Sequence, residues 1–183
     1  MDTKAEIIKL AEKLIRTRGY HGFSYKDIST RLNIKNAAIH YHFATKSDLG
    51  EAVIETIGTR QEQAFEDWAA KTPTEKLSLF MNIYQQSATD NMVCFIGALG
   101  PSATTLPLNM QQKLTEKAEI IRVWLREVLN DGIQKTEFHF KEDAKNKADL
   151  IISSLLAALI LNQITKEDML NNVLQTLKTE VGM

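Results

Sequence analysis

Residues 24–43 read SYKDISTRLNIKNAAIHYHF, and they carry the clearest signals of local structure in the chain. Ser24, with Asp27 three residues later, forms a capping box, the pattern that opens a helix. Asn33 is suited to end that helix, because asparagine tolerates the left-handed backbone conformation best after glycine. A second short helix over residues 36–42 follows after a turn too brief to be anything but a tight corner. The stretch therefore predicts a helix-turn-helix.

Several side chains of this motif are of the kinds that bind DNA. A recognition helix enters the major groove with its N-terminal residues toward the base edges. The residues expected to face the groove are Lys35, Asn36, Ala37 and Ala38, with Lys26 also within reach of a base. Lysine can hydrogen-bond guanine, asparagine can bond adenine through two atoms, and an alanine methyl can meet a thymine methyl. The residues better placed for phosphates, which fix register rather than sequence, are Tyr25, Tyr41, His42 and Lys46.

The rest of the chain is also expected to be helical, because apolar residues recur at spacings of three and four throughout. Further helices are predicted over residues 3–18, 48–70, 107–132, 143–163 and 167–181, with one more beginning at Pro73. The first helix is predicted to begin at a capping box of Thr3 and Glu6, and the helix from Asp48 to be capped by Thr45 or Ser47. The helix from Pro73 is predicted to begin at Thr72 with Glu75, and the last helix at Thr165 with Asp168. Two glycines and a proline predict a bend around a short apolar helix between residues 92 and 107. The fold class is therefore all-α.

Composition restricts the class of protein further. The chain has 183 residues, of which 44% are hydrophobic and 25% charged, the profile of one compact soluble domain or two small ones. The single cysteine, Cys94, excludes an intramolecular disulfide and suits a reducing cytoplasm. The N-terminus lacks the apolar core of a signal peptide. The most apolar stretch, Leu150 to Leu161, is shorter than the ~20 residues that a membrane span needs.

Charge is distributed unevenly along the chain. Residues 1–50 hold 9 Lys or Arg against 5 Asp or Glu, while the remainder holds 13 basic and 18 acidic residues. A positive head on a negative body suits a polyanion bound at one end only. A swing of this size also arises by chance, so it supports nucleic-acid binding without establishing it.

Residues 7–54 resemble the DNA-binding domain of TetR-type transcriptional regulators. The matching positions are Gly19, Ser24, Asp27, Ile28, Ile34, Ile39, Tyr41, His42, Phe43, Lys46, Asp48 and Leu49. Asn33 replaces the usual turn glycine, and Lys35 replaces a small polar residue. His40 replaces a tyrosine that touches a phosphate in many members, which implies a weaker or pH-sensitive contact.

The resemblance implies a repressor in two parts. Residues 1–46 are expected to bind DNA, and residues 47–183 to form a helical body that binds a small molecule and dimerises. An effector in the body would shift the long helix from Asp48 and so change the distance between two DNA-binding heads. Double-stranded DNA, in the form of a palindromic operator, is the expected partner.

The two C-terminal predicted helices are the candidate dimer interface. Their apolar residues exceed what one core can bury, which suits a four-helix bundle formed by two subunits. The residues expected to allow close approach are Ser153, Ser154, Ala157 and Ala158. The protein is therefore expected to be a homodimer.

Aromatic and other apolar residues of the body are candidates for an effector cavity, although most of them must be core. The candidate lining is Trp68, Met81, Tyr84, Phe95, Leu99, Met110 and Trp124. Such a lining implies an apolar effector. The irregular segment from Gly97 to Pro101 is expected near the cavity or its entrance.

Other function classes fit less well. The chain has no recognisable catalytic motif, so we expect neither an enzyme nor a cofactor. His40 and His42 point about 200° apart on a helix, which disfavours a metal site. Cys94 is expected to pack in the core, since nearby positive charge is lacking. A helical adaptor that binds no DNA is the alternative, but it leaves the spacing of Tyr41, Phe43 and Lys46 unexplained.

Overall fold

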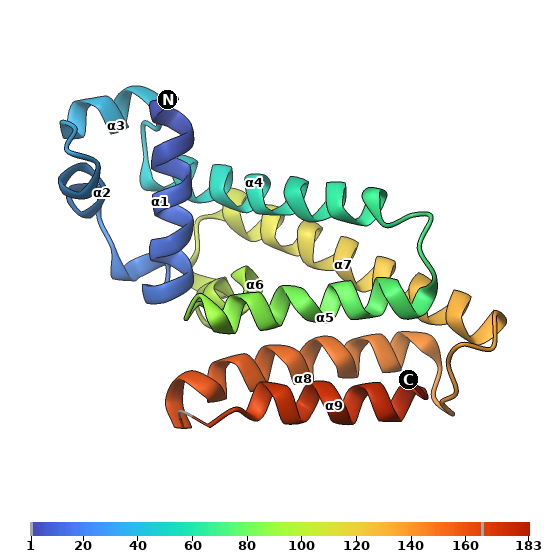
Figure 1. Ribbon diagram of the computed structural model, residues 1–183. Helices are drawn as coiled ribbons and strands as arrows, with labels where there is room; N and C mark the ends of the chain where they lie inside the picture. Colours follow the sequence, from blue (N-terminus) through green and yellow to red (C-terminus); the bar gives the residue numbers. More distant parts are fainter. Residues whose placement is uncertain (1, 166) are drawn as a thin grey trace. The chain divides into compact units, whose positions relative to one another are not determined.

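The computed structural model describes residues 2–165 and 167–183, and the regular structure within these ranges is entirely helical. The helices are α1 Thr3–Arg18, η1 Tyr20–Gly22, α2 Tyr25–Leu32, α3 Asn36–His42, α4 Lys46–Asp67, α5 Pro73–Thr89, α6 Phe95–Leu99, η2 Gly100–Thr105, α7 Leu108–Gln134, α8 Ala144–Thr165 and α9 Met169–Val181 (Figure 1). The predicted all-α class, with a helix-turn-helix at its N-terminal end, is confirmed.

The chain divides into two compact units. The first contains Met1–Glu62 and Phe95–Lys117, and the second contains Gln63–Cys94 and Ala118–Met183. Both α4 and α7 contribute residues to each unit. The division expected after residue 46 concerns function, and it stays a prediction.

Helix α1 buries an apolar stripe in the first unit, made of Ile7, Ala11, Leu14 and Ile15. Its cap differs from the predicted one. The Asp2 carboxylate accepts a hydrogen bond from the Lys4 amide at 2.9 Å, and Thr3 is the first helical residue. A charged acceptor one position earlier competes well for the free amides of the first turn.

The corner between α2 and α3 follows the sequence prediction. The Ser24 and Asp27 capping box is present, and Asn33 adopts φ 53° and ψ 44° in the left-handed region. The Asn33 amide donates to the carbonyl of Ser29 and so closes the end of α2. Ile28 and Ile39 are fully buried, which fixes the angle of the corner.

Helix α4 begins at Lys46, two residues earlier than predicted. Thr45 is its cap: the Asp48 carboxylate accepts from the Thr45 amide at 2.8 Å, and the Asp48 amide donates to the Thr45 hydroxyl at 3.1 Å. Threonine and aspartate thus form a reciprocal capping box. The connection between α3 and α4 is therefore only Phe43 to Thr45.

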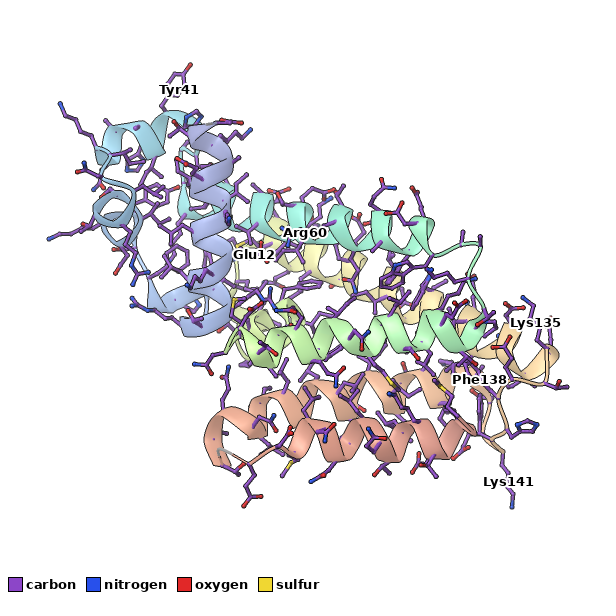
Figure 2. The ribbon with its side chains drawn as sticks, in the orientation of Figure 1. Glu12, Tyr41, Arg60, Lys135, Phe138 and Lys141 are labelled. Atoms are coloured by element: carbon purple, nitrogen blue, oxygen red, sulfur yellow. The ribbon has the colours of Figure 1, made fainter. Side chains whose placement is uncertain are left out.

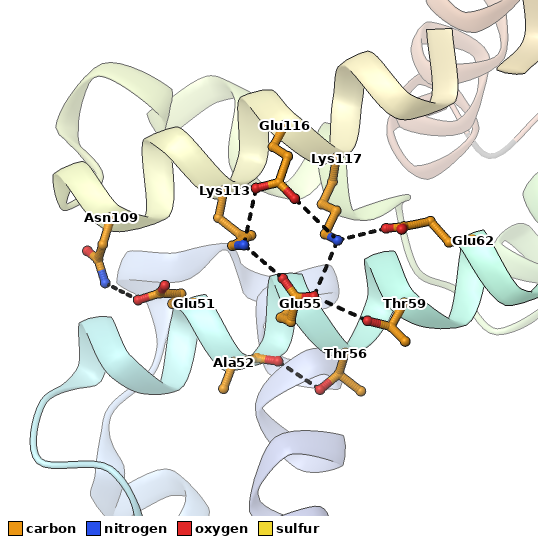
Figure 3. A network of polar contacts seen from close by, with 10 residues as sticks. All are labelled: Glu51, Ala52, Glu55, Thr56, Thr59, Glu62, Asn109, Lys113, Glu116 and Lys117. Carbon is orange, nitrogen blue, oxygen red and sulfur yellow. Dashed lines mark hydrogen bonds and ion pairs between the residues drawn. The ribbon is translucent and has the colours of Figure 1, made fainter. Parts of the chain in front are cut away.

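A ladder of polar contacts joins α4 to α7 in the first unit (Figure 3). The Asn109 amide donates to Glu51 at 2.6 Å, and the Lys117 ammonium donates to Glu62 at 2.7 Å. Lys117 also lies 3.3 Å from Glu55, although its side chain is only 6% exposed. Burial alone would lower the pKa of Lys117, but the carboxylates of Glu62 and Glu55 raise it.

Gly58 makes room for this buried lysine. A Cβ atom at Gly58 would lie 2.5 Å from the Cδ atom of Lys117, so any side chain there would displace the lysine stem. The stem packs over the glycine while the ammonium reaches carboxylates on either side of it. The sequence analysis missed this cluster, because the lysine is paired by residues more than 50 positions away.

The second unit has an aromatic core. Phe65 and Trp124 stack with ring centroids 3.9 Å apart, and Phe80 lies 5.7 Å from Trp124. Helix α5 begins at the predicted Thr72 cap with Pro73 and Glu75. Helices α8 and α9 pack side by side (Figure 1). The cap of α9 is Asp168, whose carboxylate accepts from the Asn171 amide, rather than the predicted Thr165, which is the last residue of α8.

Helix α8 is apolar around its circumference yet only partly covered. It passes the length and composition test for a membrane span, with a mean hydropathy of 1.6 over an 18-residue window, although a buried core helix can pass as well. Only 28% of that window is buried. The exposed or half-buried residues along one face are Leu150, Ser153, Ser154, Ala157, Leu161 and Ile164.

Two details of the predicted dimer surface need correction. Ala158 is 2% exposed, so it packs inside its own unit rather than on a free face. The outward face of α9 is polar, with exposed Asn171, Asn172, Gln175, Thr176 and Thr179. The uncovered apolar surface therefore lies mainly on α8, because α9 turns its leucines toward the interior of the unit, and the predicted role of both helices in a dimer stays a prediction.

Candidate nucleic-acid interface

The N-terminal turn of α3 presents most of the predicted base-reading residues to solvent. Lys35, Asn36 and Ala37 are exposed, and Ala38 is half-buried. Ile39 is fully buried and anchors the opposite face of the helix. Lys35 is the residue just before α3, so its ammonium lies at the start of the helix. Lys26, at the start of α2, is also exposed.

The C-terminal end of α3 presents Tyr41 outward. Its side chain is 85% exposed and projects away from the helices around it (Figure 2). Its ring makes an edge contact with His42, at 5.1 Å between centroids. A large exposed aromatic with a hydroxyl tip is suited to a phosphate contact.

Tyr25, which is predicted to bind a phosphate, makes hydrogen bonds within the head, and its contact with DNA stays a prediction. Its hydroxyl donates to the backbone carbonyls of Phe43 and Thr45, at 3.0 and 2.5 Å. Burial, with contributions from Asp48 and Tyr20, raises the pKa of Tyr25 to about 12. The hydroxyl therefore stays protonated and keeps donating at physiological pH.

His40 and Lys46 also make internal contacts. His40 Nδ1 lies 3.2 Å from the carbonyl of Ala44, and its ring meets that of Tyr25 edge-on at 4.8 Å. The Lys46 ammonium donates to the carbonyl of Phe23. It lies 4.3 Å from the Phe23 ring centroid and 4.7 Å from that of Tyr20. Partial burial lowers the pKa of Lys46, against a raising effect of Asp27.

The sequence analysis missed two residues beside the motif. Thr30 and Arg31 are exposed and line a groove of about 240 Å³ with Ser24, Lys26 and Asp27. Arg31 follows Asp27 by four residues, so the helical period of α2 could have placed it on this face. A cationic side chain in this groove is a further candidate for a DNA contact.

The head is tied to α4 by a buried carboxylate. Arg60 of α4 holds Glu12 of α1 through two hydrogen bonds, at 3.3 and 3.0 Å (Figure 2). Arg16 lies 3.2 Å from the same carboxylate. Since Glu12 is only 8% exposed, this pairing fixes α1 against α4 within the first unit.

The candidate effector-binding residues are distributed over both units. In the first unit Phe95, Leu99 and Met110 are buried in the core. In the second, Trp124 stacks on Phe65, and burial raises the pKa of Tyr84, with a smaller effect of Cys94. A cavity of about 590 Å³ in the second unit is lined by Ala88, Asn91, Met92, Leu159, Asn162, Gln163, Glu167 and Asp168. It includes none of the seven predicted residues, whose role stays a prediction.

An exposed recognition helix held at a buried corner defines a helix-turn-helix DNA-binding protein. Residues 7–53 match the family model described as bacterial regulatory proteins of the tetR family. Among solved structures, a TetR transcriptional regulator from Legionella pneumophila is 30% identical, with a TM-score of 0.90 over 99% of this chain and 98% of that one. The protein belongs to the TetR family and is a DNA-binding transcriptional regulator.

More distant structures share the fold. A TetR-family regulator from Agrobacterium tumefaciens is 23% identical, with a TM-score of 0.90 over 98% of this chain and 97% of that one. FadR from Bacillus subtilis, solved in complex with stearoyl-CoA, is 21% identical, with a TM-score of 0.72 over 97% of each chain. Comparison with curated protein sequences finds no match.

Proposed function

We propose that the protein is a ligand-responsive repressor that binds a palindromic operator as a homodimer and leaves it when an apolar small molecule binds the body. The observation that carries the DNA-binding part is the exposed start of α3, where Lys35, Asn36 and Ala37 stand free above the buried Ile39. These three residues, with Ala38 and Lys26, read base edges. Tyr41 and His42 contact phosphates.

A second copy of the chain covers the free face of α8. Leu150, Leu161 and Ile164 are 42%, 37% and 69% exposed, and the smaller Ser153, Ser154 and Ala157 lie between them. Large apolar side chains at the ends and small ones in the middle let a second helix approach closely. The resulting twofold pair presents two recognition helices to half-sites about one helical turn or a multiple apart.

The effector is proposed to be apolar, since the body is rich in buried aromatic and aliphatic side chains. FadR, which shares the fold, holds a fatty acyl thioester. Residues Trp68, Met81, Tyr84, Phe95, Leu99, Met110 and Trp124 remain the proposed contacts. A ligand that prefers the non-binding conformation tenfold supplies about 1.4 kcal/mol per site, within the usual range for allosteric coupling.

The proposal assigns the protein to the cytoplasm, where the operator lies, and assigns it no catalytic role. Selection of DNA fragments distinguishes this proposal from the alternative, a helical adaptor that does not bind DNA. Purified protein is incubated with random-sequence duplexes at low salt, and the retained fragments are sequenced. A repressor enriches an inverted repeat, whereas an adaptor enriches none.

Two controls make the selection decisive. Asn36→Ala should lose the enrichment of the selected repeat while still binding duplex DNA weakly. Light scattering of the unliganded protein should give the mass of a dimer. A monomer at working concentration would remove the twofold model, and retention of every duplex alike would remove sequence recognition.

A further inference from the structure

We propose that Glu12 and Arg60 are positioning residues that determine which spacing of operator half-sites the protein accepts. Neither residue contacts DNA in this proposal. Both act through the angle that the head, made of α1, α2 and α3, forms with α4. The inference deepens the proposed DNA-binding function and rests on it. We call the two residues the 12/60 clamp.

The clamp joins α1 to α4 through a buried carboxylate. Arg60 donates to both oxygens of Glu12, from Nη1 to Oε1 at 3.3 Å and from Nη2 to Oε2 at 3.0 Å (Figure 2). Glu12 is only 8% exposed, so water competes little for these bonds. A guanidinium that meets a carboxylate at two points fixes the orientation of the two groups as well as their distance.

The clamp is a second attachment between the head and α4. The first attachment is the chain itself, which passes from α3 through Phe43–Thr45 into α4 at Lys46. Arg60 lies almost four turns further along α4, about 21 Å from Lys46 at 1.5 Å per residue. With the chain junction alone, the head could turn about the connection. A second attachment about 21 Å away fixes its angle to α4.

Helix α6 also packs against α1, but through a different kind of contact. Its five residues are apolar, and Phe95 and Leu99 are buried. Burial of apolar surface is non-directional, whereas paired hydrogen bonds to a carboxylate define an angle. Of these two contacts of α1, the clamp is therefore the one that sets a direction.

The angle of the head bears directly on the spacing of the operator. Helix α4 continues beyond the clamp into the second unit, whose α8 is proposed to hold the second copy. In such a dimer the angle of each head to its α4 sets the separation of the two recognition helices. One base pair added between the half-sites moves one of them by about 3.4 Å and turns it by about 35° round the duplex. Clamped heads cannot follow both movements, so the protein should select one spacing.

Two arginines that bind the same carboxylate provide matched variants. Arg16 lies in α1 itself, 3.2 Å from Glu12, so Arg60→Gln cuts the link between the helices while Glu12 keeps a charged partner. The side chain of Arg60 is 61% exposed, so shortening it opens no cavity in the core. Arg16→Gln removes a charge beside the same carboxylate and keeps the link to α4, which makes it the control.

The test measures affinity for the selected inverted repeat and for duplexes whose half-sites are one base pair closer or further apart. Fluorescence anisotropy reports binding, and circular dichroism establishes that each variant is folded. For the wild type, we expect a changed spacing to weaken binding by about 30-fold or more, as two lost base contacts would. Arg60→Gln should reduce this penalty to about fivefold, equivalent to one lost contact. Arg16→Gln should keep the wild-type penalty.

A duplex with a single half-site tests whether Arg60→Gln leaves the reading surface intact. Wild type and Arg60→Gln should bind it equally, because the residues proposed to read bases are unchanged. Weaker binding of the single half-site by Arg60→Gln would mean that the clamp supports the recognition helix itself, which would overturn the spacing role.

Three further results would overturn the proposal. A wild-type penalty in folded Arg60→Gln would show that the angle of the head does not depend on the clamp. An equally reduced penalty in Arg16→Gln would assign the effect to the stability of the carboxylate rather than to the link between helices. Wild-type protein that binds every spacing alike would show that the heads are not held at a fixed angle.

A measurement without DNA distinguishes failure of the clamp from failure of the proposed function. Spin labels are attached to Tyr41→Cys in α3 and Thr59→Cys in α4, two exposed positions, in a Cys94→Ser background. Dilution with unlabelled protein restricts the measured distance to one chain. Pulsed electron resonance should give a broader distance distribution for Arg60→Gln than for the wild type, and an unchanged one for Arg16→Gln.

The two kinds of failure then give different results. An unchanged distance distribution in Arg60→Gln would refute the clamp even if the protein binds DNA as proposed. A broadened distribution in a protein that retains no duplex would support the clamp as the link between α1 and α4 and reject the DNA-binding assignment.

Discussion

The cluster around the buried Lys117 predicts that removing its carboxylate partners destabilises the protein more than removing the lysine charge. In the double variant Glu55→Gln/Glu62→Gln, the neutral amides keep the shape of the two carboxylates while the Lys117 ammonium keeps its charge. Lys117 is 6% exposed, and its remaining charged partner would be Glu116 at 3.6 Å. A buried charge without any compensation costs about 3–5 kcal/mol, and Glu116 still compensates this one in part, so we expect a loss below that range but above about 1 kcal/mol.

The reverse change should cost far less. Lys117→Met keeps an unbranched stem over Gly58 and removes the buried charge. The carboxylates left behind, Glu55, Glu62 and Glu116, are 46%, 39% and 51% exposed, so water can solvate them. The expected loss is about 0–1 kcal/mol.

Urea unfolding followed by circular dichroism, at one fixed protein concentration, measures both losses. Thermal melting should agree, with a shift of about 2–4 °C per kcal/mol for a chain of this size. Glu119→Gln is the control, because that carboxylate is 57% exposed and should change stability by less than about 0.5 kcal/mol. If Lys117→Met destabilises the protein as much as the double variant does, the uncompensated charge of the ammonium is not the cause of the double variant's loss of stability.

Three further predictions concern other parts of the chain. Gly132→Ala should cost about 1–3 kcal/mol in urea unfolding, because its Cβ would lie 2.0 Å from the ring of the buried Phe138. Gly100→Ala, which meets nothing within 4 Å, should be neutral, and equal losses would contradict the packing explanation. Ile164→Glu places a charge on the free face of α8 and should shift light scattering from dimer to monomer; an unchanged mass would move the interface elsewhere. Hydrogen bonds from Lys113 and Arg122 lower the pKa of Glu55 below 4.5 and the pKa of Asp149 below 3.8. The free energy of unfolding that these two ion pairs contribute is therefore present above those pH values, and it should be lost as the pH falls below them. A urea midpoint equal at pH 7 and pH 3 would count against these pairs.

Local signals in the sequence predicted the motif well. The Ser24 and Asp27 capping box and the left-handed backbone of Asn33 depend only on residues a few positions apart, so the local sequence is enough to predict them. The first cap was wrong because Asp2 and Thr3 are adjacent candidates and the charged one prevails. Helix α4 began early for a similar reason, since Thr45 could pair with Asp48.

Long-range pairing was beyond the sequence analysis. Glu12 and Lys117 are charged residues that become buried only because Arg60 and Glu62, which lie far away in the sequence, pair with them inside the first unit. The ring contacts of Lys46 were missed in the same way, because they depend on where Tyr20 and Phe23 pack. The phosphate contact predicted for Lys46 stays a prediction.

Helix α4 is long enough that a small tilt at one end would displace the other end considerably. Its 22 residues extend about 33 Å, so a tilt of about 5° about one end carries the other end through about 3 Å. That travel nearly equals the 3.4 Å rise of one base pair. Because Arg60 fastens α1 to this helix, α1 would follow such a tilt.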